Sequence, residues 1–170
     1  MNRSTSLLLL LLVLVACRLD SSDWGVVTAG IRQRYPDVDT LTTGQLATWL
    51  AEADTVHPIL LDVRQLDEYS VSHLAGAKHS PAFTAAVVAL AAAALDTPIV
   101  TYCSVGYRSA GVAQQLQEHG YTRVLNLRGS LFQWANEGRM MVDANGPARL
   151  VHPYGDPWSG LLDEGLHWTE

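Results

Sequence analysis

Cysteine is scarce in this sequence, which has only Cys17 and Cys103 among its 170 residues. Zinc sites made of several cysteines and Cys-x-x-Cys redox motifs need closely spaced thiols, so the sequence excludes both. Whether Cys103 is the only thiol of the mature chain depends on the fate of Cys17.

Positive charge is also limited. Lys78 is the single lysine, the ten arginines are scattered along the chain, and the formal net charge is −6. Because no basic stripe exists, nucleic-acid binding and an electrostatic grip on anionic lipid have little support. With 48% apolar and 16% charged residues, the composition is that of a globular protein, and the length suits one domain with its own core.

Hydrophobic runs long enough to span a membrane are absent as well, and the run near the start of the chain has ten apolar residues at positions 7–16. A membrane-spanning helix needs about 20 residues, so this run is too short to cross a bilayer. Together with Arg3 it fits the hydrophobic region of a secretory signal peptide. The sequence LVAC at positions 14–17 resembles the lipobox of bacterial lipoproteins, in which the cysteine is acylated and the chain is cut just before it. The alternatives are an ordinary signal peptide and a short buried helix.

We therefore expect residues 1–16 to be a lipoprotein signal peptide, Cys17 to carry the lipid, and residues 17–25 to tether the domain. The protein would then be anchored to a membrane of the cell envelope, facing the periplasm or the exterior. Arg18 after the cysteine favours the outer membrane if the envelope is Gram-negative. With Cys17 acylated, Cys103 would have no disulfide partner in its own chain.

Strand-like and helix-like segments alternate over the rest of the chain. Apolar runs such as Ile59–Val63 and Ile99–Tyr102 predict buried strands, and periodic apolar residues predict helices between them. The predicted strands cover 37–42, 59–63, 76–79, 99–102 and 123–127. The predicted helices cover 26–34, 43–53 with Thr43 as the cap, 66–70, 84–95, 108–119 and a segment from Gly129. This alternation indicates an α/β fold with a mostly parallel five-stranded sheet flanked by helices on both faces.

The segment CSVGYR at 103–108 follows one of these strands and enters a helix. Backbone N–H groups at the start of a helix, together with the helix dipole, favour an anion in the loop. A cysteine there should have a lowered pKa, and Arg108 adds a permanent positive charge. Cysteine phosphatases place the arginine six positions after the cysteine, whereas Arg108 is five positions after Cys103. The shorter loop makes a smaller cradle, which suits a terminal sulfur atom better than a phosphate.

The motifs around this loop resemble those of a single-domain rhodanese. They are ILLDVRQLDEYSVSHLAGAKHSP (59–81), IVTYCSVGYRSAGVAQQLQEHGY (99–121) and VLNLRGSLFQWANEG (124–138), and the resemblance spans residues 26–142. It implies the rhodanese-like fold and an enzyme of sulfur transfer, with Cys103 as the catalytic nucleophile that becomes a persulfide.

The resemblance also implies a binding site around the cysteine. The backbone N–H groups of the loop would stabilise the thiolate and the persulfide, and Arg108 would help to bind the donor. The substrate-binding residues implied in this way are Ser104, Val105, Gly106, Tyr107, Arg108 and Ser109. The implied partners are a small anionic sulfur donor such as thiosulfate and a thiol or protein as sulfur acceptor, with no metal and no organic cofactor.

Asp62 and Arg64 of the DVR motif are expected to support the site rather than to react. They would do so through a buried hydrogen bond and an ion pair with Glu68 or a neighbour, and Asp62 could also brace the loop. Residues 143–170 depart from the minimal family pattern and are rich in aromatic residues. We expect this extension to pack on the domain, and a sharper hypothesis places it over the cysteine loop.

Two other functions stay open at this point. The domain could be a non-catalytic persulfide carrier or an interaction module of the cell envelope, which a lipid anchor and the extension would suit. A phosphatase or arsenate reductase on the same scaffold conflicts with the loop length.

Overall fold

The structure is a computed structural model that describes residues 23–155 and 157–169. The expected signal peptide, the lipidation site Cys17 and most of the tether lie outside these residues, so their assignments stay predictions. Within the described ranges, no helix is long and apolar enough to cross a membrane.

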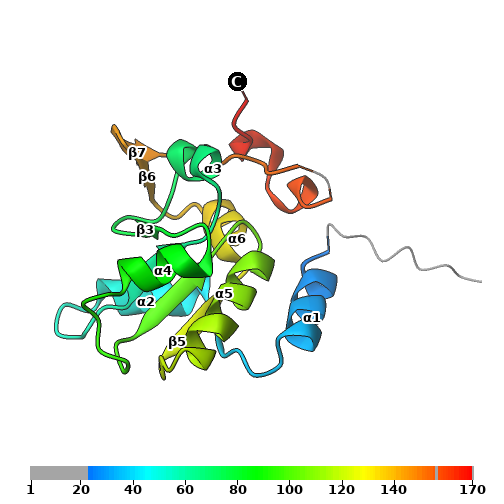
Figure 1. The fold of residues 1–170 in the computed structure, drawn as a ribbon. Coiled ribbons are helices and arrows are strands. Elements are labelled where there is room, and N and C mark those ends of the chain that lie inside the picture. Colours follow the sequence, from blue (N-terminus) through cyan, green and yellow to red (C-terminus); the bar gives the residue numbers. More distant parts are fainter. Residues whose placement is uncertain (1–22, 156, 170) are drawn as a thin grey trace, which may run out of the picture.

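A five-stranded sheet forms the centre of the fold (Figure 1). Its strands are β1 (Thr40–Thr42), β2 (Ile59–Asp62), β3 (Lys78–His79), β4 (Ile99–Tyr102) and β5 (Val124–Arg128). The order is β1-β5-β4-β2-β3 and every pair is parallel, which confirms the predicted α/β fold. All residues of the central strand β4 are buried, as expected for a strand covered on both faces. Since the strands are parallel, their carboxyl ends lie at one edge of the sheet.

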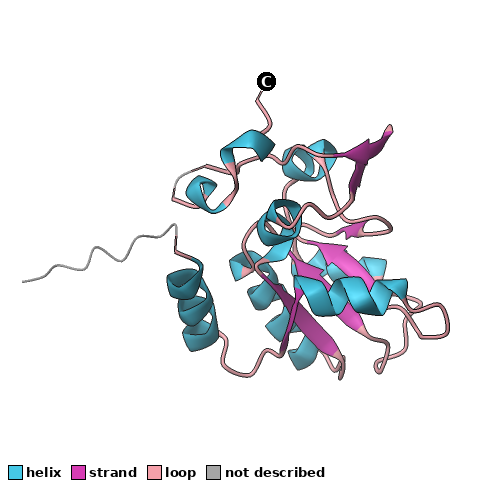
Figure 2. Cartoon of the chain, turned by 180° about the vertical axis from the view of Figure 1, so that it is seen from behind, coloured by secondary structure: helices cyan, strands magenta, loops and turns pink. Residues whose placement is uncertain are grey.

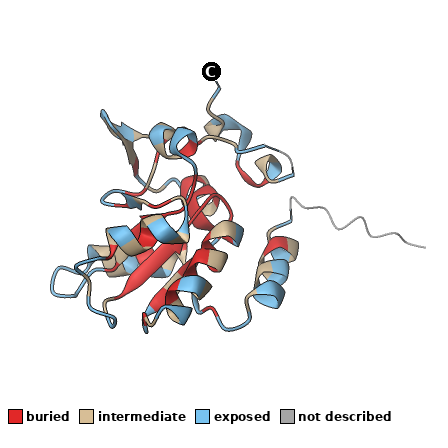
Figure 3. Ribbon diagram, in the orientation of Figure 1, coloured by how far each residue is buried: buried red, intermediate tan, exposed pale blue. Residues whose placement is uncertain are grey.

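Helices cover both faces of this sheet, as Figure 1 and Figure 2 show. The helices are α1 (Trp24–Arg34), α2 (Thr43–Ala51), α3 (Leu66–Val71), α4 (Phe83–Ala89), α5 (Tyr107–Glu118) and α6 (Ser130–Asn136). Of these, α3 lies beside the β6–β7 hairpin rather than on a face of the sheet. Successive residues of β4 point to opposite faces. Val100 and Tyr102 belong to a buried cluster with residues of α1, α2 and α6, whereas Ile99 and Cys103 belong to one with residues of α4 and α5. Figure 3 shows buried residues, in red, on the sheet and on the helix faces turned towards it.

The start of α1 and the cap of α2 differ from those expected. α1 begins at Trp24, inside the expected tether, because the Asp23 carboxylate accepts hydrogen bonds from the N–H groups of its first turn. The cap of α2 is Thr42, whereas Thr43 is the cap expected from the sequence. The Thr42 hydroxyl accepts from the Gln45 N–H at 3.1 Å, and the Gln45 side chain accepts in return from the Thr42 N–H at 2.8 Å. This reciprocal pair satisfies two backbone donors at the start of the helix.

α4 ends at Ala89, well before the predicted end at residue 95. The alanine-rich sequence has high helix propensity, but the chain turns from Leu90 towards β4. The Leu90 side chain is buried, and the Leu95 carbonyl accepts a hydrogen bond from the Thr122 N–H at 2.8 Å. Tertiary contacts therefore override the local propensity here.

The residues beyond α6 form a hairpin and an irregular segment that returns to the core. β6 (Met141–Asp143) pairs antiparallel with β7 (Gly146–Ala148), and two short 3-10 helices follow, η1 (Ser159–Leu161) and η2 (Glu164–Leu166). Val151, Leu161 and Leu162 are buried in the same cluster as residues of α2 and α6. This part of the chain therefore belongs to the hydrophobic core.

Truncation of Leu161 tests this packing. Leu161→Ala shortens a side chain that is 3% exposed, and we expect it to lower the free energy of unfolding by about 2–5 kcal/mol. Leu150→Ala, at a residue 40% exposed in the same segment, should change it by less than about 0.5 kcal/mol. Urea unfolding followed by tryptophan fluorescence measures both. Equal, small losses would show that the segment adds nothing to the core.

Candidate active site

Cys103 stands where β4 ends and the chain turns into α5. Gly106 makes the turn with a φ of 106°, a conformation that residues with a side chain rarely adopt. A Cβ on Gly106 would also lie 3.4 Å from the carbonyl oxygen of Leu127. The glycine therefore lets the loop close on the cysteine, and Cys103 is only 1% exposed.

Hydrogen-bond donors surround the sulfur of Cys103. The Gly106 N–H donates to Sγ at 3.1 Å, and the Ser109 N–H is a further donor to it. Burial alone would raise the pKa of Cys103, but the charge of Arg108 and these donors outweigh it and hold the pKa below its usual value. The thiol is therefore prepared to ionise and to act as a nucleophile.

Arg108 is engaged with Glu68 of α3. Its Nη1 and Nη2 donate to the two Glu68 oxygens at 2.7 Å each, and Nη2 also donates to the Ser104 hydroxyl at 3.0 Å. Burial opposes both charges, yet their pairing raises the pKa of Arg108 and lowers that of Glu68. Cys103, Arg108 and Glu68 thus form one charged cluster at the carboxyl edge of the sheet.

Asp62 and Arg64 pair with each other, and the alternative in which Arg64 pairs with Glu68 is wrong. Arg64 Nη2 lies 2.6 Å from Asp62 Oδ2, and both side chains are fully buried. Arg64 Nη2 also donates to the carbonyl of Ser72, which follows α3. The pair therefore joins the end of β2 to the end of α3. The Asp62 carboxylate is hydrogen-bonded to Arg64 and to the side chain of Tyr102, which directly precedes Cys103.

Two residues that were not predicted from the sequence fix the loop by hydrogen bonds. Asn126 Nδ2 donates to the Gly106 carbonyl at 3.0 Å, and its Oδ1 accepts from the Ser109 hydroxyl at 2.7 Å. Ser130 Oγ accepts from the Cys103 N–H at 3.2 Å. Asn126 interrupts the apolar run VLNL, and a polar residue in a buried strand is the signal that could have identified it.

The remaining loop residues have different surroundings. The Ser104 hydroxyl donates to Glu68 Oε1 at 2.9 Å, and Val105 is buried in the cluster on the α2 and α6 face. Tyr107 is 43% exposed and meets the Tyr35 ring edge-on, with centroids 5.8 Å apart. The structure therefore brings the side chains of Ser104, Arg108 and Ser109 and the Gly106 N–H together near Cys103. The side chains of Val105 and Tyr107 have other surroundings, and the role of their backbone N–H groups stays a prediction.

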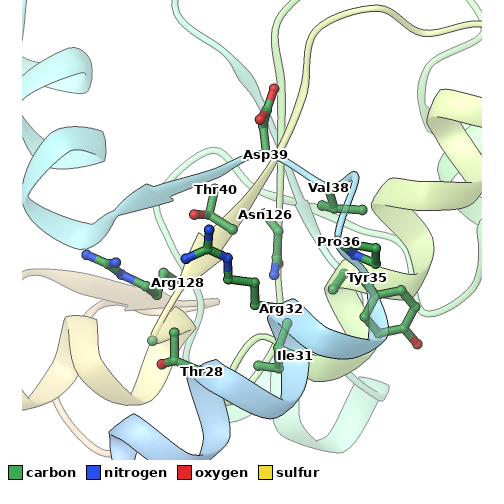
Figure 4. A pocket seen from close by; sticks show the side chains of 12 residues that line it. Thr28, Ile31, Arg32, Tyr35, Pro36, Val38, Asp39, Thr40, Asn126 and Arg128 are labelled. Carbon is green, nitrogen blue, oxygen red and sulfur yellow. The ribbon is translucent and has the colours of Figure 1, made fainter.

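A cavity of about 390 Å³ lies behind the loop, between α1 and the sheet edge formed by β1 and β5 (Figure 4). Arg32, Asn126 and Arg128 line it, whereas Cys103 does not. Asn126, whose side chain is hydrogen-bonded to the loop at Gly106, is part of the cavity wall. The cavity therefore lies next to the loop but does not open onto the sulfur of Cys103. Within residues 23–155 and 157–169, no group of three His, Cys, Asp or Glu residues is placed to hold a metal ion.

The influence of Arg108 on the thiol is testable by substitution. Arg108→Gln removes the charge, so we expect the pKa of Cys103 to rise and the pH midpoint of its alkylation by iodoacetamide to move upwards. Arg123→Gln, just before β5 at the opposite edge of the sheet, is the control and should leave the profile unchanged. If the midpoint stays in place in Arg108→Gln, the hydrogen-bond donors alone set the pKa.

The fold and the site together define a class of protein: an α/β protein with a reactive-cysteine loop at the carboxyl end of its central strand. A family model described as "Rhodanese-like domain" matches residues 42–137. The chain is 33% identical over 94 residues to a sulfurtransferase of Allochromatium vinosum, which covers 55% of this chain and 87% of that protein. It is 31% identical over 78 residues to the uncharacterised protein YqhL of Bacillus subtilis, covering 46% of this chain and 61% of that one. The chain therefore belongs to the rhodanese-like domain family.

Solved structures show the same fold. The thiosulfate sulfurtransferase of Pseudomonas aeruginosa aligns with a TM-score of 0.60 at 20% identity, covering 74% of this chain and 24% of that one. At this identity the likeness concerns the fold alone. Family membership and the relative from Allochromatium vinosum support sulfurtransferase activity in general.

Proposed function

We propose that the protein takes sulfane sulfur from a small anionic donor of the thiosulfate type and passes it to a thiol or another thiophilic acceptor through a persulfide on Cys103. The observation that carries this proposal is the buried thiol, whose pKa is lowered by Arg108 and by the N–H donors at the start of α5. A thiol with a lowered pKa ionises more readily, which lessens the need for a dedicated base.

Sulfur transfer then takes two steps. In the first, the Cys103 thiolate attacks the outer sulfur of thiosulfate, the S–S bond of the donor breaks, and sulfite leaves with the electron pair. In the second, the acceptor attacks the outer sulfur of the persulfide, the new S–S bond breaks, and Cys103 leaves as the thiolate. Because a neutral sulfur atom moves in each step, no external oxidant or reductant is needed.

The surrounding residues would stabilise negative charge rather than transfer protons. The Gly106 and Ser109 N–H groups would stabilise the thiolate before the first step and the leaving thiolate in the second. Arg108 would help to attract the anionic donor, and Glu68 fixes the direction of its guanidinium.

A steady-state assay tests the proposed function. With thiosulfate as donor and cyanide as acceptor, we expect thiocyanate and sulfite in equal amounts and ping-pong kinetics, because the acceptor meets the enzyme only after sulfite has left. Absence of turnover with every sulfane donor and acceptor tried would contradict the proposal.

The second candidate is a persulfide carrier, or an interaction module, of the cell envelope. The observation in its favour is that Cys103 is 1% exposed and that Arg108 is already paired with Glu68, which would slow the entry of small molecules. Slow turnover with cyanide, together with rapid transfer to one envelope protein, would favour this carrier over the enzyme.

We also propose that residues 1–16 are a lipoprotein signal peptide and that an acylated Cys17 holds the domain at the cell envelope, facing the periplasm or the exterior. The support is the short apolar run that ends in the LVAC sequence. Incorporation of labelled palmitate in the full chain, lost in Cys17→Ala, is the expected result. Equal labelling of both chains would contradict it.

A further inference from the structure

Tyr154 connects the segment after β7 to the charged cluster of the active site. It lies beyond residues 42–137, which the family model matches. Its ring stands over the guanidinium of Arg108, with 4.4 Å between Cζ and the ring centroid. That distance is well within the range of a cation–π interaction. A residue outside the family pattern therefore touches an arginine that the family pattern places at the sulfur.

The fold, rather than the tyrosine itself, places this ring. Val151 is fully buried, and its N–H donates to the Leu166 carbonyl at 2.8 Å while its carbonyl accepts from the Trp168 N–H at 2.9 Å. Tyr154 has a φ of 68°, an unusual conformation for a residue with a side chain. The chain thus leaves the core at Val151 and turns sharply at Tyr154, where the ring meets Arg108.

The ring and Glu68 together restrain Arg108. Both carboxylate oxygens of Glu68 accept from the guanidinium, the Ser104 hydroxyl accepts from it too, and the Tyr154 ring covers one of its faces. Covering a face keeps water away from the ion pair, and an ion pair is stronger where water is excluded. Tyr154 therefore favours the state in which Arg108 is bound to Glu68.

The consequence concerns the charge of the donor. With the Cys103 thiolate, Glu68 and Arg108 counted together, the site carries one net negative charge. A doubly charged donor such as thiosulfate needs Arg108 released from Glu68, whereas a singly charged or neutral donor needs this less. The restraint on Arg108 thus discriminates between donors by their charge.

We propose that Tyr154 is a specificity-determining residue that favours small-molecule persulfides over thiosulfate as sulfur donors. The inference rests on the proposed function, because it concerns the donor of that same transfer. The Cys103 thiolate attacks the outer sulfur of R–S–SH, the S–S bond of the donor breaks, and R–S⁻ leaves. The proton of the donor stays on the transferred sulfur, so the step balances without another reactant.

Two substitutions of Tyr154 test the proposal in the full chain. The measured quantity is kcat/KM for thiosulfate divided by kcat/KM for cysteine persulfide, with the same acceptor. Tyr154→Ala should raise this ratio about threefold to tenfold, because the guanidinium loses its cover. Tyr154→Phe keeps the ring and should stay within about twofold of the parent chain. Leu150→Ala, an exposed residue of the same segment, is the matched control and should leave the ratio unchanged.

The outcomes separate this inference from the proposed function. If Tyr154→Ala still forms the Cys103 persulfide but its donor ratio stays the same or falls, Tyr154 does not set donor choice and the inference is overturned. A matching rise in Tyr154→Phe would also overturn it, because the ring would then be irrelevant. If the parent chain forms no persulfide with either donor, the proposed function fails, and the inference fails with it.

Discussion

Cys103→Ser is expected to abolish sulfur transfer, with turnover reduced by about three orders of magnitude or more. A serine hydroxyl in the same place has a far higher pKa than a thiol and cannot form a persulfide. The same donors that stabilise the thiolate, the Gly106 N–H and Ser109, would still be present, so the loss isolates the nucleophile. Thiocyanate formation from thiosulfate and cyanide measures the effect.

The control for this substitution is the thermal midpoint of unfolding, which shows whether the variant still folds. Serine is close to cysteine in shape, and Cys103 is one residue in a large buried cluster, so the thermal midpoint should change little. A Cys103→Ser chain that folds and keeps turning over thiosulfate would show that the sulfur passes through another group, and the proposed mechanism would be wrong.

Arg64→Met is expected to cost about 3–5 kcal/mol in the free energy of unfolding, the largest effect on stability among the charged residues discussed. It removes one partner of a fully buried ion pair and leaves the Asp62 carboxylate without a compensating charge. Urea unfolding gives the difference. The reason is the desolvation of an isolated charge rather than the loss of one contact.

Two further variants distinguish the burial of an uncompensated charge from a simple loss of packing. Arg139→Met breaks a half-exposed ion pair with Glu137 and should cost at most about 1 kcal/mol. The double variant Asp62→Leu with Arg64→Met removes both buried charges and should recover much of the stability lost in Arg64→Met. A double variant no more stable than Arg64→Met would show that burial of an uncompensated charge is not the cause.

The central part of the site could be predicted from the sequence because it is local. β4, the loop and the start of α5 are contiguous, and Arg108 is five positions after Cys103, so spacing alone places the charge near the thiol. The parallel sheet was predictable for a similar reason, since each buried strand is a short apolar run separated from the next by a helical pattern.

The rest depends on contacts between distant positions. Glu68 and Arg108 are 40 positions apart, and nothing in the sequence decides whether Glu68 pairs with Arg108 or with Arg64. Packing decides it, because Asp62 already takes the Arg64 guanidinium. The contact between Tyr154 and Arg108 follows from the path of an irregular segment, whose anchoring residues show no periodic pattern. Residues 84–95 show the reverse case, in which high helix propensity is overridden by the turn that leads to β4.

Mass spectrometry of the full chain after incubation with thiosulfate tests the central claim most directly. We predict that the mass rises by one sulfur atom, that fragmentation places this atom on Cys103, and that a thiol acceptor removes it. The same treatment of Cys103→Ser should leave its mass unchanged. An unmodified Cys103 after exposure to thiosulfate, a small-molecule persulfide and other sulfane donors, or a sulfur atom carried equally by Cys103→Ser, would contradict the account.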